Sequence, residues 1–185
     1  MSTQRLFVAL RPPAYVRDDL SARLSNLNLS RLRRVPPDDW HITVAFIGPV
    51  RQDASCKVAA AVEETAGLAT QQLSLRLAGG GCFDPGARNI VHVGLDGDVA
   101  ALTGIADDLD TRLGRIGFAG KQRCYVPHLT VSYVHGRLSG SEIAADLAVL
   151  EKYRGPRWVA TELVLYRSDL GAAVRYEQLE RYVLP

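Results

Sequence analysis

Hydrophobic and polar positions along the chain form blocks that switch between a strand period and a helix period. After Pro12 and Pro13, apolar residues recur at spacings of three and four, the period of a helix that begins near a proline. The apolar face of this helix is Val16, Leu20, Leu24 and Leu27. The first half of the chain predicts strands over residues 5–10, 41–47 and 72–77, with helices around residues 16–27 and 53–69 between them.

The run Gly79-Gly80-Gly81 predicts a turn and a boundary between two halves, because glycine clusters interrupt regular structure. Beyond it the same order of elements returns. Ser139 and Glu142 have the spacing of a capping box, which predicts a helix start. The second half predicts strands over residues 89–95, 128–134 and 158–166, helices around 99–116 and 139–153, and a last strand over 174–183 that forms a hairpin through the loop 169–171.

This repeated order predicts an α+β fold with two pseudo-symmetric lobes. Each lobe is expected to be a mainly antiparallel sheet with helices on its outer face, and a cleft is expected between the lobes. We predict a single bilobed domain over residues 1–185, with an internal repeat of approximately 4–78 and 88–167 and a closing strand over 173–184. A pseudo-twofold axis would set the middle strands of the two halves opposite one another.

Those two middle strands carry the same phrase, His41-Ile42-Thr43 and His128-Leu129-Thr130, each followed by apolar residues and a glycine. Alternate residues of a strand share a face and lie ~7 Å apart, so each phrase presents an imidazole beside a hydroxyl. Imidazole can move a proton near neutral pH, and a hydroxyl can donate to a phosphate oxygen. Two such pairs face to face predict an acid, a base and an anion cradle, suited to phosphoester cleavage without a metal. The plain alternative is a pair of half-buried histidines on amphipathic strands.

Composition excludes several classes of protein. The net charge of +2 lacks the strong positive field of a nonspecific DNA coat, and no apolar run predicts a membrane span or a secretory signal. Cys56, Cys82 and Cys124 are odd in number and lack Cys-x-x-Cys spacing, so we expect reduced thiols that serve packing in a cytoplasmic protein. No His-x-His or His/Asp cluster has metal-ligand spacing, so a metal hydrolase is disfavoured and no metal or cofactor is expected. We also expect a monomer.

Several further residues are candidates for substrate binding. Arginine matches phosphate oxygens best, and Arg31, Arg33 and Arg34 stand just before the first phrase, where they could receive an RNA backbone or form only a solvated basic turn. Phe7 on the first strand and Phe83 after the glycine run could stack on bases, with core packing as the alternative.

With these residues identified, the chain resembles the two-histidine (2H) phosphoesterases, and most closely the bacterial RNA 2′,3′-cyclic phosphodiesterases, also called 2′-5′ RNA ligases. The resemblance covers nearly the whole chain. It rests on the two phrases and on four flanking segments: the opening 5–10, the lead-in 35–40, Pro127 before the second phrase, and the late segment 163–168.

The resemblance implies hydrolysis of a terminal 2′,3′-cyclic phosphate of RNA to a 2′-phosphate, with reverse 2′-5′ ligation in vitro. His41 would be the acid toward the 3′ oxygen and His128 the base, with Thr43 and Thr130 holding the nonbridging oxygens; the residues alone do not separate the two histidine roles. The partners would be RNA ends or nucleotide 2′,3′-cyclic phosphates.

The chain departs from the family pattern at Tyr133, where an arginine often touches the phosphate, and at His92, where an aromatic residue is common. Another arginine would then replace that phosphate contact. We interpret His92 as a core or cleft-wall residue and His135 as a surface residue. Two alternatives stay open: a non-catalytic nucleotide- or RNA-binding module, which Tyr133 permits, and a phosphodiesterase for a small cyclic nucleotide-type phosphate.

Overall fold

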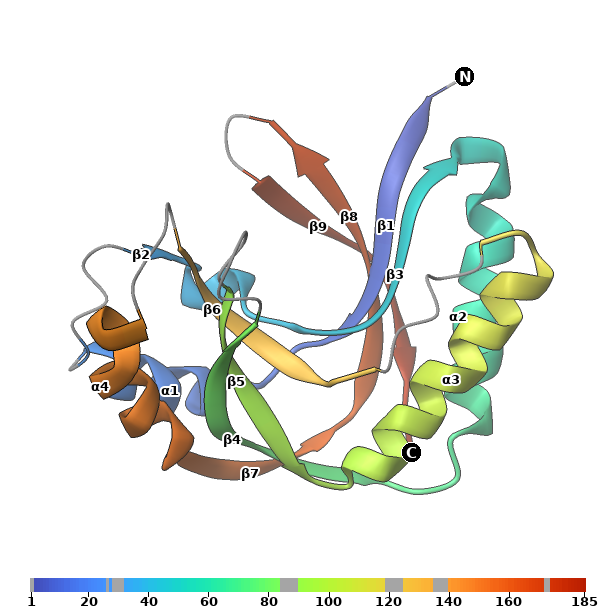
Figure 1. Cartoon of the computed structure of the whole chain (residues 1–185). Helices are drawn as coiled ribbons and strands as arrows, with labels where there is room; N and C mark the ends of the chain where they lie inside the picture. Colours follow the sequence, from blue (N-terminus) through green and yellow to red (C-terminus); the bar gives the residue numbers. More distant parts are fainter. Residues whose placement is uncertain are drawn as a thin grey trace.

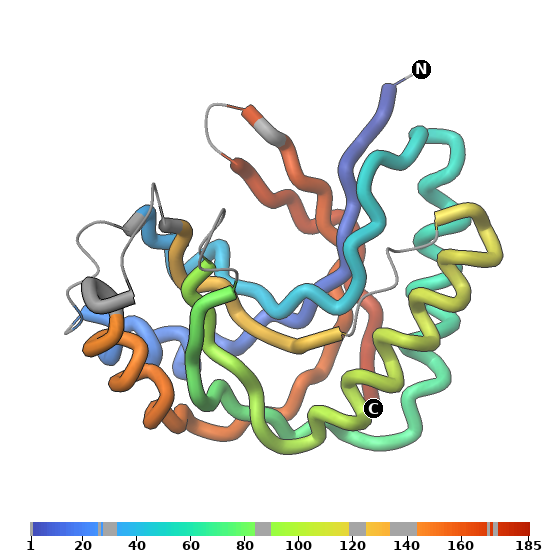
Figure 2. The backbone as a smooth tube through the Cα atoms, in the orientation of Figure 1, coloured from blue at the N-terminus to red at the C-terminus, as the bar shows by residue number. Residues whose placement is uncertain are grey.

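Strands and helices alternate along the chain largely as the hydrophobic pattern predicts. The computed structural model describes residues 2–25, 27, 32–83, 90–118, 125–134, 140–171 and 174–185. The elements are β1 (Thr3–Leu10), α1 (Ala14–Ser25), β2 (Leu32–Arg34), β3 (Ile42–Arg51), α2 (Ser55–Leu68), β4 (Leu73–Phe83), β5 (Ile90–Gly97), α3 (Val99–Arg115), β6 (His128–Val134), α4 (Gly140–Glu151), β7 (Arg154–Ala160), β8 (Glu162–Leu170) and β9 (Val174–Val183), with 3₁₀ helices at Pro37–Asp39 and Gln52–Ala54. Figure 2 traces this path from the N-terminus to the C-terminus.

The strands of the described residues form one antiparallel sheet of nine strands, in the order β7-β4-β5-β6-β3-β1-β8-β9, with β2 paired to β6. One residue, Thr161, joins β7 at one edge of the sheet to β8 near the other edge. Such a short connection requires the sheet to curl until its two ends lie close together, as Figure 1 shows. In the described part of the chain, no helix has the length and apolar character needed to cross a membrane.

Helices cover the outer side of the curled sheet, which confirms the predicted class of fold. α2 and α3 contact one another and pack on β3, β8 and β9, whereas α1 and α4 pack on β7 and β4 at the other end of the sheet (Figure 1). The main core lies between helices and sheet, and its fully buried members include Leu6, Leu20, Ile42, Leu75, Leu109 and Leu129.

Elements from the two halves of the sequence pack on one another. α1, from the first half, packs on β7 of the second, and α3, from the second half, packs on β3 of the first. From the central β3–β6 pair, the sheet continues through β1, β8 and β9 on one side and through β5, β4 and β7 on the other. The boundaries of the internal repeat remain a prediction.

Two predicted boundaries are wrong. The glycine run is not a turn, since β4 continues through it to Phe83 and pairs with β5. The register slips between Leu77 and Gly80, and Gly79 has a φ of 68°, so a bulge carries the strand onward. The predicted strand over 158–166 is two strands, β7 and β8, separated at Thr161.

The structure also bears on predictions for the arginine turn and the cysteines. The predicted arginine turn contains a short edge strand, β2, which holds Arg33 and Arg34. Cys56 is exposed on α2, so the prediction that it serves packing is wrong. Arg31, Cys124, His135 and Ser139 lie outside the described residues.

We expect Gly80→Ala to destabilise the fold by about 1–3 kcal/mol, the usual cost of overpacking. A Cβ at Gly80 would lie 2.6 Å from Cβ of Leu150 in α4 and 3.0 Å from the carbonyl oxygen of His92 in β5. Gly67→Ala is the matched control, because nothing lies within 4 Å of a Cβ there. Since alanine is the better helix former, Gly67→Ala should stabilise α2 by about 0.5–1 kcal/mol. Urea unfolding midpoints of the two variants test this; equal midpoints would show that α4 does not press on β4.

Candidate active site

The two His-x-Thr phrases meet at the centre of the sheet. β3 and β6 pair through Ile42 and Leu129, which each follow a motif histidine and are both fully buried in the core. Because residues alternate between faces along a strand, the residues on either side of this pair turn to the face opposite the helices. Antiparallel register then sets His41 beside Thr130, and Thr43 beside His128. All four predicted residues share one face, across a single strand pair.

The same hydrogen bond orients both imidazole rings. Nδ1 of His41 lies 2.7 Å from the carbonyl oxygen of Asp39, and Nδ1 of His128 lies 2.7 Å from the carbonyl oxygen of Val126. A carbonyl oxygen can only accept, so Nδ1 carries the hydrogen and donates it in both rings. In the neutral rings Nε2 is therefore the unprotonated nitrogen, the atom that can take up and return a proton.

The threonine hydroxyls are available to a ligand. Thr43 and Thr130 are partly exposed, and no group among the described residues hydrogen-bonds to either hydroxyl. The backbone that carries Thr43 is held by Tyr125, whose hydroxyl donates to the Thr43 carbonyl oxygen over 3.1 Å. Two free donors on a fixed backbone can hold the oxygens of an anion between them.

Aromatic rings surround His41. Phe7 of β1 lies 4.9 Å from the imidazole between ring centroids, and Tyr176 of β9 lies 5.0 Å from it, edge to face. Tyr166 of β8 stacks on Phe7 at 5.0 Å. Phe7 is only 2% exposed, so it packs against His41 and offers no open surface for stacking a base. The core-packing alternative for Phe7 is thus the one that the geometry favours.

A second aromatic group surrounds His128. Phe83 lies 4.8 Å from the imidazole, edge to face, and stacks on His92 with ring centroids 3.9 Å apart. His92 in turn lies 5.6 Å from His128. A third histidine therefore forms the wall beside His128, in agreement with the wall interpretation of His92. Phe83 is partly exposed, so stacking on a ligand remains open to it.

Burial favours the neutral form of two of these histidines, His41 and His92. Burial lowers the pKa of His41 below 6.5, nearby His128 lowers it further, and the Asp39 carbonyl opposes the shift. Burial first, and then His128, lowers the pKa of His92 to about 4. His92 is consequently neutral near pH 7 and adds no positive charge beside His128.

A bulge in β6 decides where Tyr133 lies. His92 pairs with Thr130 while the adjacent Val91 pairs with Ser132, so Val131 is an extra residue in the ladder. The extra residue turns Ser132 inward, where it is fully buried, and brings Tyr133 to the face of the histidines. Tyr133 is 41% exposed there.

The arginine nearest to Tyr133 in the sheet is Arg33, its cross-strand partner in β2. Directly opposed residues share a face, so Arg33 lies on the side of the histidines. Arg34 does not, since its guanidinium donates to the carbonyl oxygen of Leu27 over 3.3 Å, toward the end of α1. The sequence analysis named Arg31, Arg33 and Arg34 together, and the pairing of β2 with β6 makes Arg33 better placed than Arg34.

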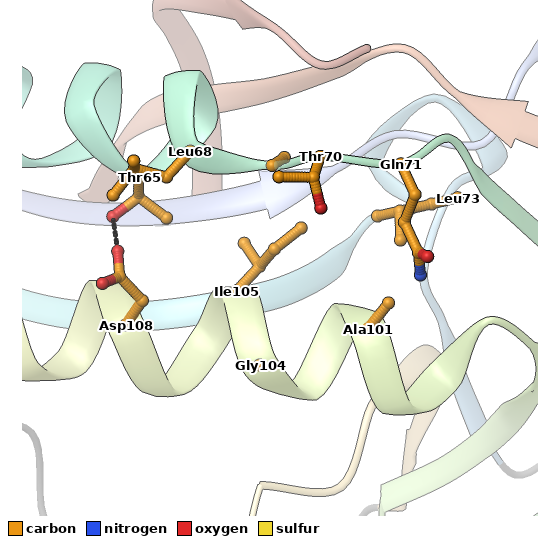
Figure 3. Close-up of a pocket in the computed structure, with 10 residues that line it drawn as sticks. Thr65, Leu68, Thr70, Gln71, Leu73, Ala101, Gly104, Ile105 and Asp108 are labelled. Atoms are coloured by element: carbon orange, nitrogen blue, oxygen red, sulfur yellow. Dashed lines mark hydrogen bonds between the residues drawn. The ribbon is translucent and has the colours of Figure 1, made fainter.

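A separate pocket lies away from the histidines, between α2 and α3. Thr65 on α2 donates to Asp108 on α3 over 2.7 Å at one end of it, and Ile105 lines its floor (Figure 3). None of the four motif residues lines this pocket. In the described part of the chain, no group of three His, Cys, Asp or Glu side chains is placed to hold a metal ion.

Two His-x-Thr strands that meet at the centre of a curled antiparallel sheet, with both imidazoles on one face, are the arrangement of a two-histidine phosphoesterase. The family model of the 2′-5′ RNA ligase superfamily matches residues 12–172, and the chain belongs to this superfamily.

Curated relatives and solved structures agree with this assignment. An RNA 2′,3′-cyclic phosphodiesterase of Archaeoglobus fulgidus is 30% identical over 132 residues, which cover 70% of this chain and 72% of the relative. One of Methanothermobacter thermautotrophicus is 27% identical over 173 residues, which cover 91% and 92%. The crystal structure of E. coli LigT in apo form superposes with a TM-score of 0.78 at 23% identity, covering 100% of this chain and 99% of LigT. The LigT likeness shows that the fold is shared.

Proposed function

We propose that this protein hydrolyses the 2′,3′-cyclic phosphate at the 3′ end of RNA and leaves a 2′-phosphate. The similar archaeal proteins carry the name of this activity. The observation that carries the proposal is the Ile42–Leu129 pair, because it sets two imidazoles and two hydroxyls on one face of one strand pair. That group of side chains supplies what the reaction needs.

The reaction requires one proton to be removed and one to be supplied. One histidine accepts a proton from water through Nε2 as the water oxygen attacks phosphorus. The bond between phosphorus and the ribose 3′ oxygen breaks, and the other histidine, protonated, donates to that oxygen. The two histidines exchange protonation states in one turnover and are reset through solvent. Each proton transfer contributes roughly 10²- to 10⁴-fold to the rate.

The threonines stabilise the charge that grows on the phosphate. Their hydroxyls donate to the two nonbridging oxygens, which become more negative as water adds to phosphorus. Tyr133, brought to this face by the bulge in β6, donates through its hydroxyl at the position where the family resemblance implies an arginine. Arg33, across from Tyr133, supplies the positive charge that a tyrosine lacks.

The pH dependence of kcat/KM should separate the two histidine roles. The pKa of His41 lies below 6.5 because the ring is buried. If His41 is the base, it acts when neutral. In that case kcat/KM rises with pH through that pKa and reaches a plateau above pH 6.5. If His41 is the acid it acts when protonated, so kcat/KM falls as the pH rises through the same value. Burial favours the neutral ring and hence the base role, opposite to the role that the family resemblance implies.

The proposal is tested with an RNA oligonucleotide ending in a 2′,3′-cyclic phosphate. We expect multiple turnovers to a product with a 2′-phosphate, with the same rate in the presence of a chelator. A 3′-phosphate product would show that the other bond breaks and would contradict the mechanism. Tight binding of a nucleotide with no product over hours would favour the non-catalytic binding module. Ligation of a cyclic-phosphate end to a 5′-hydroxyl end is the same displacement with that hydroxyl attacking phosphorus in place of water, and it is expected at high RNA concentration. The monomeric state and the cytoplasmic location remain predictions.

A further inference from the structure

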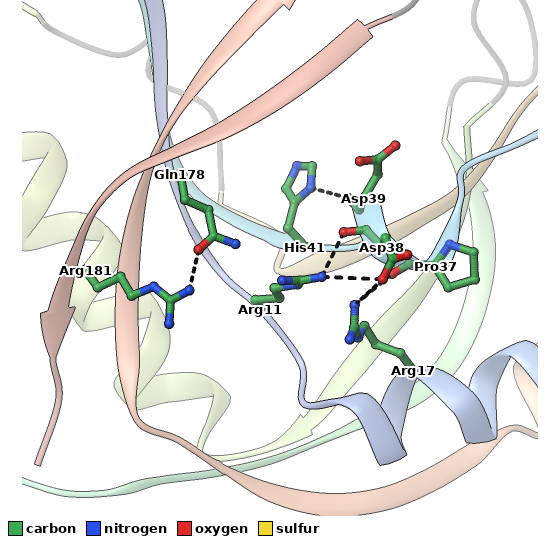
Figure 4. Close-up of polar contacts among 8 residues, drawn as sticks. All are labelled: Arg11, Arg17, Pro37, Asp38, Asp39, His41, Gln178 and Arg181. Atoms are coloured by element: carbon green, nitrogen blue, oxygen red, sulfur yellow. Dashed lines mark hydrogen bonds and ion pairs between the residues drawn. The ribbon is translucent and has the colours of Figure 1, made fainter.

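A pocket lined by three arginines lies near His41, because Arg11 lines the pocket and lies close to that histidine (Figure 4). Leu10, the last residue of β1, pairs with Ile42, so Arg11 is the next sheet neighbour of His41. The pocket has a volume of about 250 Å³ and lies where β7 passes into β8, at the seam of the curled sheet. Its polar lining residues are Arg11, Arg17, Trp158, Thr161, Glu162, Gln178 and Arg181.

Positive charge exceeds negative charge around this pocket. Arg11 and Arg17 share one carboxylate, with guanidinium nitrogens 3.6 Å and 3.2 Å from Oδ1 of Asp38. Asp38 is 90% exposed, so its charge is largely screened by water. Figure 4 shows Arg11 close to His41, with Asp38 on one side and Gln178 and Arg181 on the other. Arg181 is 60% exposed and lies 3.6 Å from Glu162.

Three residues that line the pocket also carry buried hydrogen-bond donors without a partner among the described residues. Nε of Arg11, Nε of Arg17 and Nε1 of Trp158 are buried and have no hydrogen-bond partner among the described residues. Buried donors in folded proteins are nearly always paired, so a group of unpaired ones in one place needs an explanation. An acceptor-rich ligand in the pocket would pair with the two arginine donors once those side chains rotate toward it.

Tyr166 connects this pocket to the active site. Its ring lies 6.2 Å from His41 between centroids and stacks on Phe7. The charges of Arg11 and Arg181 act on its hydroxyl, whose pKa is raised chiefly by burial. Tyr166 therefore lies between His41 and the charged groups around the pocket, so a ligand of two adjoining phosphates could reach both places.

We propose that the arginine pocket binds the phosphate on the 5′ side of the terminal nucleotide, so that the protein distinguishes RNA ends from cyclic mononucleotides. The inference rests on the proposed function. It assigns a second anion subsite that does no chemistry and selects the substrate. Guanidinium groups suit it, because their planar fork matches phosphate oxygens and each charged hydrogen bond is stronger than a neutral one.

The test compares two substrates that differ by one phosphate: 2′,3′-cyclic AMP with and without a 5′-phosphate. We expect wild-type kcat/KM to be about tenfold or more higher for the 5′-phosphorylated compound, the effect of a charged hydrogen bond. Arg181→Gln should reduce this preference to about twofold or less, mostly through KM, and leave turnover of the unphosphorylated compound unchanged. Arg175→Gln is the matched control, because Arg175 is exposed on the same strand and does not line the pocket.

Two results would overturn the inference while leaving the activity intact: no preference in the wild type, or equal losses on both substrates in Arg181→Gln. Equal losses of kcat/KM on both substrates would mean that Arg181 only supports the structure of the active site. Binding of the two compounds to His128→Ala by calorimetry repeats the comparison without turnover. A missing preference there also counts against the pocket, whereas a preference without any wild-type turnover would count against the proposed function alone. For a longer RNA, Arg181→Gln should lower the salt slope of log Kd by about 0.7, the loss of one phosphate contact.

Discussion

His41→Ala and His128→Ala should each lower the kcat for a cyclic-phosphate RNA end by about 10²- to 10⁴-fold. Each substitution removes one of the two proton transfers, while the opposite imidazole remains in place. Both histidines are partly buried residues on the face opposite the helix-packed core, so folding should be preserved. Turnover assays with circular dichroism and thermal melts of both variants test this. A near-normal rate in either variant would end the two-histidine mechanism.

The losses of kcat caused by the two histidine substitutions should not be additive in the double variant. If both rings act in one transition state, the double variant should lose about as much as either single variant, because groups that work as a unit are not additive. His92→Phe is the comparison, since it keeps a ring stacked on Phe83 and removes only the imidazole. As a wall residue, His92 should affect kcat far less than His128. A loss in His92→Phe equal to that in His128→Ala would instead make His92 a participant in proton transfer.

Thr43→Val and Thr130→Val should each lower kcat by about 10²- to 10³-fold, the usual effect of losing a donor to a developing oxyanion. Valine keeps the size and branching of threonine and removes only the hydroxyl. Because neither hydroxyl has a partner within the described protein, its loss should leave the melting temperature nearly unchanged. The loss should appear in kcat more than in KM if the hydrogen bonds strengthen in the transition state.

Thr111→Val is the control for these threonine variants. Its hydroxyl donates to the Asp107 carbonyl oxygen within α3, on the outer side of the sheet. We expect it to leave kcat unchanged. If Thr43→Val and Thr130→Val behaved like Thr111→Val, the phosphate would have to be held by other groups, with Tyr133 and Arg33 as the first candidates.

The four candidate residues of the two motifs stand out in the sequence because their signal is local. Strand alternation alone puts His41 and Thr43 on one face, and the second phrase repeats the pattern at His128 and Thr130. The long helices are equally local, since the apolar spacing from Val99 to Ile116 predicts α3 nearly to its ends. Turn signals were less reliable: the three glycines of β4 mark a bulge and a close approach to Leu150 rather than a chain reversal.

By itself, then, the sequence determined the type of most elements, the four motif residues and their shared faces, since each depends on neighbours within a few positions. Only the tertiary structure decided which strand lies beside which: the pairing of Ile42 with Leu129, the packing of α1 on β7, and the bulge that turns Tyr133 toward the histidines. The arginine pocket belongs to this second group, because Arg11, Trp158 and Arg181 are far apart in the chain and meet only where the curled sheet closes. Contacts between distant segments depend on how entire faces of the sheet and helices are buried against one another. They therefore cannot be predicted from a short stretch of sequence.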